Sequence, residues 1–165
     1  AIVSPRSATT YPALVFTEAF PGLRHGRGTA FAFQLLAGRR MNPEPLAETL
    51  NAAGLPGAAA EPHWLRTDGH RLGGVRLCVT DPARFRPVVV SLQLLTALRD
   101  RYAGRDFWHP RRFRAGFFNK LYGTASVREA LRQGADAAAI ADAWAPGQCR
   151  FRRRRRQHLL YPHAR

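Results

Sequence analysis

A helical pattern of apolar residues runs from about Pro87 to Tyr102. Apolar residues recur there at intervals of three or four, which places them on one stripe of a helix. The members of this stripe are Val88, Leu92, Leu95 and Leu98. Because an apolar helix stripe must be buried against another element, this segment constrains the fold more than any other.

Two strand-like segments precede that helix. They are PHWLRT, residues 62–67, and GGVRLCVTD, residues 73–81. The turn residues Asp68–Gly69 and Gly73–Gly74 bound them, since Gly and Asp favour turns. Asp81–Pro82 then opens a further turn before the helix.

The first third of the chain predicts strands, loops and one helix. TYPALVFTEAF, residues 10–20, has a short apolar core of β type, and the Gly-rich segment 21–30 connects it to Phe31–Leu36, which is either a second strand or the start of a helix. Asn42 and Pro43 suit the start of a helix that Gly54 would end.

The last third predicts helices after an irregular, aromatic-rich segment, FWHPRRFRAGFFNKLYG, residues 107–123. The segment SVRE, Ser126–Glu129, fits the capping-box pattern. Asp136 can cap the next helix, and Pro146 fits the first turn of a basic closing helix and tail, residues 146–165. The apolar residues expected to anchor one face of that closing helix are Phe151, Leu159 and Leu160.

This order of elements predicts an α/β fold, with α+β as the alternative: a small mixed sheet covered by helices, followed by a helical C-terminal part. The length of 165 residues suits a single domain, residues 1–165.

The chain is strongly basic, with a formal net charge of +15. Such a charge favours a polyanionic partner: nucleic acid, an anionic membrane surface or an anionic wall polymer. A compositional explanation competes, because every basic side chain except Lys120 is arginine and alanine is abundant, as GC-rich codons would produce. The arginine run at residues 152–156 could bind nucleic acid phosphates, but a solvated helix is the favoured interpretation.

Several kinds of site have no support in the sequence. Cys78 and Cys149 form no CxxC pair, and no Cys or His spacing indicates zinc. We therefore expect neither a metal nor a cofactor. The longest apolar run, Val88–Leu98, is too short to span a bilayer. No signal peptide is visible at Ala1, and since the chain does not begin with methionine we expect it to be a fragment or a processed product.

The stretch HGRGT, His25–Thr29, matches neither the phosphate-binding pattern GxxxxGK[ST] nor the dinucleotide pattern GxGxxG. Gly26 and Gly28 allow the backbone to approach a ligand closely, and the guanidinium of Arg27 between them can bind a carboxylate through two hydrogen bonds. The alternative is that Arg27 pairs with an internal acid and holds the loop in place.

Glu18 is the acidic residue that best fits glycosidase chemistry. It ends an apolar segment, where partial burial would suit a general acid. Most glycosidases need two carboxylates at a set separation, and no second acid lies in a comparable loop. A structural carboxylate bonded to the backbone of GRGT, residues 26–29, is favoured over a catalytic role for Glu18.

An ordered set of motifs resembles the C-terminal domain of the NamZ-type exo-β-N-acetylmuramidases. The matching segments are SP near the start, YPALVFTEAF with GRGTAFAF, GGVRLCVTDPARFRPVVVSLQLLTAL, FNKLYGTASVREALRQGADAAAIADAW, and FRRRRRQHLLY. Each is weak alone, but together they cover almost the whole chain in the order of the family.

The resemblance implies a periplasmic or secreted peptidoglycan hydrolase that releases N-acetylmuramic acid from non-reducing ends without a metal. In the family a larger, Rossmann-like domain precedes this one and forms most of the cleft; that catalytic domain is absent from this sequence. The residues expected to contact the sugar are Glu18, Gly26, Arg27, Gly28 and Thr29, and Glu18 is the candidate catalytic residue. By itself this chain is expected to be inactive.

The sequence departs from the family pattern beside these residues. Ala19, Phe20 and Pro21 follow the glutamate where the family has Gly-Thr-Asn, and Arg6 follows Ser-Pro where an asparagine is expected. Two other functions therefore stay open: a divergent wall- or glycan-binding module without activity, and nucleic-acid binding through the arginine-rich tail.

Overall fold

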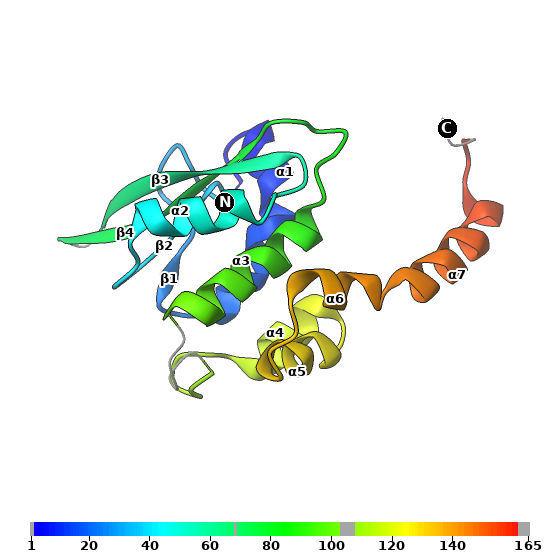
Figure 1. Ribbon diagram of the computed structural model, residues 1–165. Coiled ribbons are helices and arrows are strands. Elements are labelled where there is room, and N and C mark those ends of the chain that lie inside the picture. Colours follow the sequence, from blue (N-terminus) through cyan, green and yellow to red (C-terminus); the bar gives the residue numbers. More distant parts are fainter. Residues whose placement is uncertain (1, 68, 103–107, 162–165) are drawn as a thin grey trace.

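The computed structural model describes residues 2–67, 69–102 and 108–161 (Figure 1). The N-terminal half contains α1 (Pro5–Leu14), the 3-10 helix η1 (Val15–Ala19), β1 (Leu23–Arg24), β2 (Leu35–Gly38), α2 (Pro43–Ala52), β3 (Ala58–Thr67) and β4 (His70–Val79). The C-terminal half contains α3 (Pro87–Tyr102), α4 (Ala115–Tyr122), α5 (Ser126–Arg132), α6 (Ala137–Asp142), α7 (Ala145–Arg155) and the 3-10 helix η3 (Arg156–His158).

The four strands form one sheet in the order β1-β2-β4-β3. Strands β3 and β4 are a hairpin whose register runs from Ala58 opposite Val79 to Thr67 opposite His70. Helices cover the sheet, so the predicted class is confirmed. Every described pairing is antiparallel, so the sheet is not mixed in direction. Strand β3 is an edge of the sheet, and Pro62 lies within it.

Gly73 and Gly74 lie inside β4, so their assignment to a turn is wrong. A side chain at Gly74 would collide with the carbonyl oxygen of Leu36 on β2, and one at Gly73 would collide with the carbonyl of Met41. The two glycines therefore let β2 and the turn before α2 lie directly against β4.

Helix α3 separates two apolar cores and contributes to both. Val90, Leu94 and Leu98 pack with α1, α2 and one face of the sheet. Leu92 and Leu95 pack on the opposite side against α4, α5 and α6. The predicted stripe thus covers only part of the buried surface of α3, because this helix is enclosed on both sides (Figure 1).

The segment predicted as a strand over residues 10–20 is instead α1 followed by η1. Ser4 caps α1 by accepting a hydrogen bond from the backbone N–H of Ser7, and Pro5 occupies the first turn. These two residues are the Ser-Pro motif, and they suit a helix start because the cap satisfies a free N–H and proline needs none. The cap and the burial of Ala13 and Leu14 override the β-forming residues that follow.

The C-terminal helices differ from the sequence expectation in two places. Part of the segment predicted as irregular is α4, while residues 103–107 lie outside the described part of the chain. The capping box is wrong, because the N-cap of α5 is Ala125 and Ser126 is already helical. The cap of α6 is confirmed: Asp136 accepts from the backbone N–H of Ala139 at 2.7 Å.

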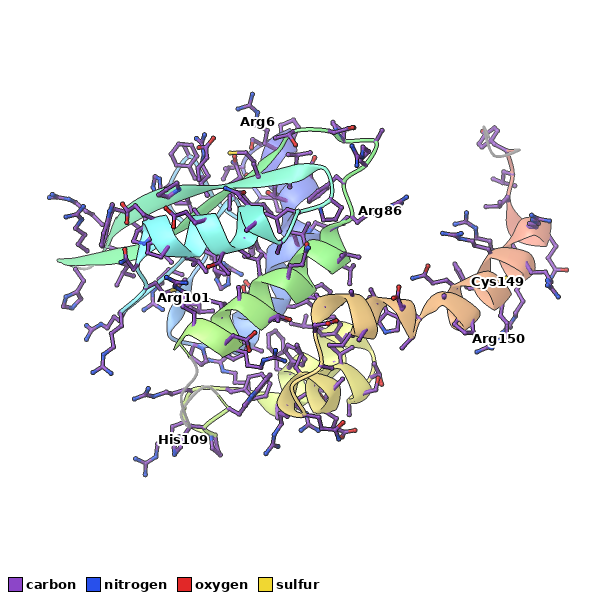
Figure 2. The ribbon with its side chains drawn as sticks, in the orientation of Figure 1. Arg6, Arg86, Arg101, His109, Cys149 and Arg150 are labelled. Carbon is purple, nitrogen blue, oxygen red and sulfur yellow. The ribbon has the colours of Figure 1, made fainter. Side chains whose placement is uncertain are left out.

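Helix α7 leaves the body of the molecule and has no buried residue (Figure 1). Phe151, Leu159 and Leu160 are exposed, so the expected apolar anchor is not formed by the described residues. Figure 2 shows side chains projecting around this helix, including Cys149 and Arg150. No helix in the described ranges is long and apolar enough to cross a bilayer.

Candidate functional site

An open pocket with a volume of about 630 Å³ lies between η1, the loop that joins β1 to β2, the end of β3 and the start of α4. The structure brings together on its wall all the residues that the sequence singled out. They are Glu18, Gly26, Arg27, Gly28 and Thr29. This size falls within the range of small-molecule sites.

Glu18 and Arg27 form an ion pair across the pocket wall. The Glu18 side chain is 19% exposed and the Arg27 side chain 56% exposed, so the pair lies at the border between protein and solvent. The guanidinium carbon of Arg27 also lies 4.9 Å from the ring centre of Phe33. The partner of Arg27 within the protein is therefore an internal acid, which is the loop-holding arrangement considered from the sequence.

The loop around Arg27 is shaped by its neighbours in the chain. Gly26 and Gly28 have φ angles of +65° and +83°, a region in which residues with a Cβ are strained. Thr29 holds the turn, because its hydroxyl donates to the Gly26 carbonyl at 2.7 Å and accepts from the Phe31 N–H at 3.0 Å. These contacts set the position from which Arg27 projects.

The loop is attached to α1 through Phe33, a residue with φ of +55°. Its N–H donates to the His25 carbonyl at 2.7 Å, and its carbonyl accepts from the Thr10 hydroxyl at 2.6 Å. The N-terminal helix therefore supports the pocket wall directly.

His25 lines the same pocket and is buried rather than solvated. Its Nε2 lies 2.8 Å from the hydroxyl of Thr17. Burial lowers the pKa of His25 to about 4, with Glu18 opposing and Arg27 and Arg24 reinforcing the change. The imidazole is neutral at neutral pH, so it supports the loop and adds no charge to the pocket.

The structure adds pocket residues that were not among the expected sugar contacts. Arg66 comes from the end of β3, and Arg114 and Phe117 come from the start of α4. The backbone N–H of Arg114 donates to the Ala19 carbonyl at 2.8 Å, which fixes α4 beside η1. These residues lie far from HGRGT in the sequence, and nothing in their local pattern distinguishes them from surface residues.

The chemistry available in this pocket is that of one carboxylate and several guanidinium groups. Glu18 is the only acidic side chain among the described residues that line it. Among the described residues, the pocket therefore lacks the second carboxylate that a two-carboxylate hydrolysis needs. The described residues contain no cluster of three or more metal-binding side chains. Both cysteines have free thiols, with Cys78 half-buried and Cys149 exposed.

Comparison with known proteins gives a consistent result. A family model described as exo-beta-N-acetylmuramidase NamZ, C-terminal, matches residues 9–161. The peptidoglycan beta-N-acetylmuramidase NamZ of Bacillus subtilis (strain 168) is 29% identical over 160 residues, covering 94% of this chain and 37% of that protein. The crystal structure of a DUF1343 family protein from Bacteroides fragilis matches with a TM-score of 0.85 and 25% identity, covering 98% of this chain and 44% of the other. The chain thus spans less than half the length of either relative.

Proposed function

Because this chain belongs to the family of the exo-beta-N-acetylmuramidase NamZ C-terminal domain, we propose that it forms one side of the substrate cleft of a peptidoglycan glycosidase. In this proposal the pocket around Glu18 and Arg27 binds an N-acetylmuramic acid residue at the non-reducing end of a glycan strand. The enzyme acts outside the cytoplasm or in the cell wall, where this substrate is found.

The observation that carries the proposal is the convergence of the family's two hallmark segments on one pocket. Glu18 ends the apolar segment, and Arg27 lies nine residues later, in the loop 26–29. Their side chains meet as an ion pair on the pocket wall. The pair leaves further N–H groups on Arg27 and a second oxygen on Glu18, and these groups suit the hydroxyl and amide groups of a sugar. In this proposal the loop 26–29 lies beside the sugar, and its position is set by the backbone of Gly26, Gly28 and Thr29.

Catalysis is proposed to need a second part of the enzyme. Glu18 is held in an ion pair with Arg27 and is the only carboxyl group among the described residues that line the pocket. The other carboxylic group of a glycosidase would come from a preceding Rossmann-like domain, as the resemblance implies. The length difference from the relatives supports this division. The chain alone is therefore expected to bind sugar without cleaving it.

The test is titration of this chain with N-acetylmuramic acid, followed by NMR, beside an assay for release of the sugar from purified peptidoglycan. We expect chemical-shift changes in residues 18–29, a loss of about tenfold in affinity for Arg27→Ala, and no release. No binding at millimolar sugar would exclude this chain as a sugar-contacting half of the cleft. Release by the chain alone would contradict the need for a second domain.

Helix α7 favours a second candidate function, a binding module for anionic wall polymers. None of its residues is buried, and it carries five arginines, Arg150 and the four consecutive residues from Arg152 to Arg155. Retention on purified walls that falls steeply with salt, without affinity for N-acetylmuramic acid, would support this alternative. Equally salt-sensitive binding of duplex DNA would favour the nucleic-acid hypothesis instead.

A further inference from the structure

We propose that Arg66 and Arg114 bind an anionic substituent of the sugar, the carboxylate that distinguishes N-acetylmuramic acid from N-acetylglucosamine. This inference rests on the proposed function and assigns specificity within the same pocket. It moves the carboxylate-binding role away from Arg27, where the sequence alone would place it.

The first argument is the distribution of charge in the pocket. Its described lining contains four arginines and one acid. Arg27 is paired with Glu18, and Arg24 donates to the Pro21 carbonyl at 2.9 Å and to the Leu23 carbonyl at 3.4 Å. Neither guanidinium of Arg66 and Arg114 has a partner among the residues that the structure describes. The pocket thus holds two cations available to a ligand, and an anionic ligand matches them.

The second argument is that separate, well-anchored elements present the two arginines. Arg66 lies on β3, paired through the hairpin with Arg71, whose guanidinium is stacked over Trp64 with its central carbon 3.9 Å from the ring centre. Arg114 is the N-cap residue of α4, and its N–H is bonded to Ala19. The positive end of the α4 dipole lies at the same point and adds to the attraction for an anion.

The third argument is the apolar surface beside these cations. Leu65 precedes Arg66, and Phe117, which is 37% exposed, lies in the first turn after Arg114. The lactyl ether of N-acetylmuramic acid carries a methyl group next to its carboxylate, so it needs an apolar contact and a cation side by side. N-acetylglucosamine carries a hydroxyl at that position and needs neither.

The inference is tested by measuring the affinity of this chain for three sugars by calorimetry or NMR. These are N-acetylmuramic acid, its methyl ester, which removes the charge and keeps the lactyl group, and N-acetylglucosamine. The variants are Arg66→Ala, Arg114→Ala and the double variant. The matched control is Arg111→Ala, an exposed arginine of the same segment that does not line the pocket.

We expect the unmodified chain to bind the acid about tenfold more tightly than the methyl ester, and the double variant to lose this preference without change in affinity for the two neutral sugars. Equal affinities for acid and ester, or a preference that survives in the double variant, would overturn the inference and leave the proposed function standing. Failure to bind any of the three sugars would overturn both. Arg111→Ala should behave as the unmodified chain.

Discussion

At the scale of one residue, His25 shows how a buried side chain supports the pocket loop. Its imidazole is buried, bonded to Thr17, and has a pKa of about 4 in the folded chain. In the unfolded chain a histidine has a pKa of about 6.5. Between these values the unfolded state takes up a proton that the folded state does not, so this contribution to stability is complete above pH 6.5 and is lost as the pH falls toward 4.

We therefore predict that His25→Gln removes a pH-dependent part of the unfolding free energy. Lowering the pH from 7 to 4.5 should destabilise the unmodified chain by up to about 3 kcal/mol more than the variant. Urea denaturation at pH 7, 5.5 and 4.5 measures the difference. His158→Gln, which alters an exposed histidine, should retain the pH dependence of the unmodified chain. Parallel curves for the His25 variant and the unmodified chain would contradict the prediction.

The two glycines of the loop offer a second prediction at this scale. Both have positive φ, but a Cβ at Gly26 would also meet the Phe31 carbonyl, whereas one at Gly28 would have open space. Gly28→Ala should cost about 1–2 kcal/mol from backbone strain alone, and Gly26→Ala at least about 1 kcal/mol more. Thermal denaturation of both variants measures which loses more stability. Equal losses would show that the backbone at Phe31 moves away from the new Cβ at no cost in free energy.

The candidate site was only partly predictable from individual residues. Glu18 and Arg27 lie nine positions apart, and the resemblance assigned both to the contact with the sugar. The sequence left open that Arg27 pairs with an internal acid, but it did not identify Glu18 as that acid. Arg66 and Arg114 were not predictable, because 26 basic residues in the chain look alike until the fold places two of them in a pocket.

At the scale of the element, the N-caps of α5 and α6 show that a capping motif in the sequence is not always used as a cap in the structure. Asp136 caps α6 with its side chain, whereas Ser126 is inside α5 and its side chain bonds to the hydroxyl of Thr124 instead of capping the helix. Asp136→Ala should therefore lower the unfolding free energy by about 1 kcal/mol, and Ser126→Ala by less than about 0.5 kcal/mol. Urea denaturation of the two variants measures both, and a larger loss for Ser126→Ala would restore the capping-box interpretation.

Elements were predictable where the local pattern and the tertiary contacts agree. The helix over residues 87–102 was predicted from its apolar stripe. The two hairpin strands were predicted from their strand-like segments, although Gly73 and Gly74 lie inside β4 and not in a turn. Residues 10–20 were not predictable from composition, because Tyr11, Val15 and Phe16 favour strands while the Ser4 cap and burial against α3 select a helix. In this segment the tertiary contacts determine the secondary structure, because the local preferences are weak.

At the scale of the whole molecule, α7 stands apart from both cores. None of its residues is buried, so deleting residues 146–165 should change the unfolding free energy by no more than about 0.5 kcal/mol. Ile140→Ala, which opens the second core at α6, should cost about 2–4 kcal/mol. Denaturation of the two proteins compares them, and a loss above about 2 kcal/mol on deletion would show that α7 packs on the body in solution.

The fold class was predictable because it depends only on the order of strands and helices. The division of the packing around α3 into two cores was not predictable, because the sequence indicated one apolar face on this helix and the structure buries two. A helix enclosed on both sides has apolar residues around most of its circumference, and its periodicity is correspondingly weak.

The outer strand of the sheet has a consequence for how copies of this protein behave toward one another. An uncovered edge strand can pair with the same strand of another molecule and start aggregation. Pro62 interrupts the row of N–H donors along β3, and the exposed charges of Glu61 and Arg66 lie on either side of it. Two β3 edges brought together would meet a gap in their hydrogen bonds, so this edge of the sheet resists pairing with a second copy of the chain.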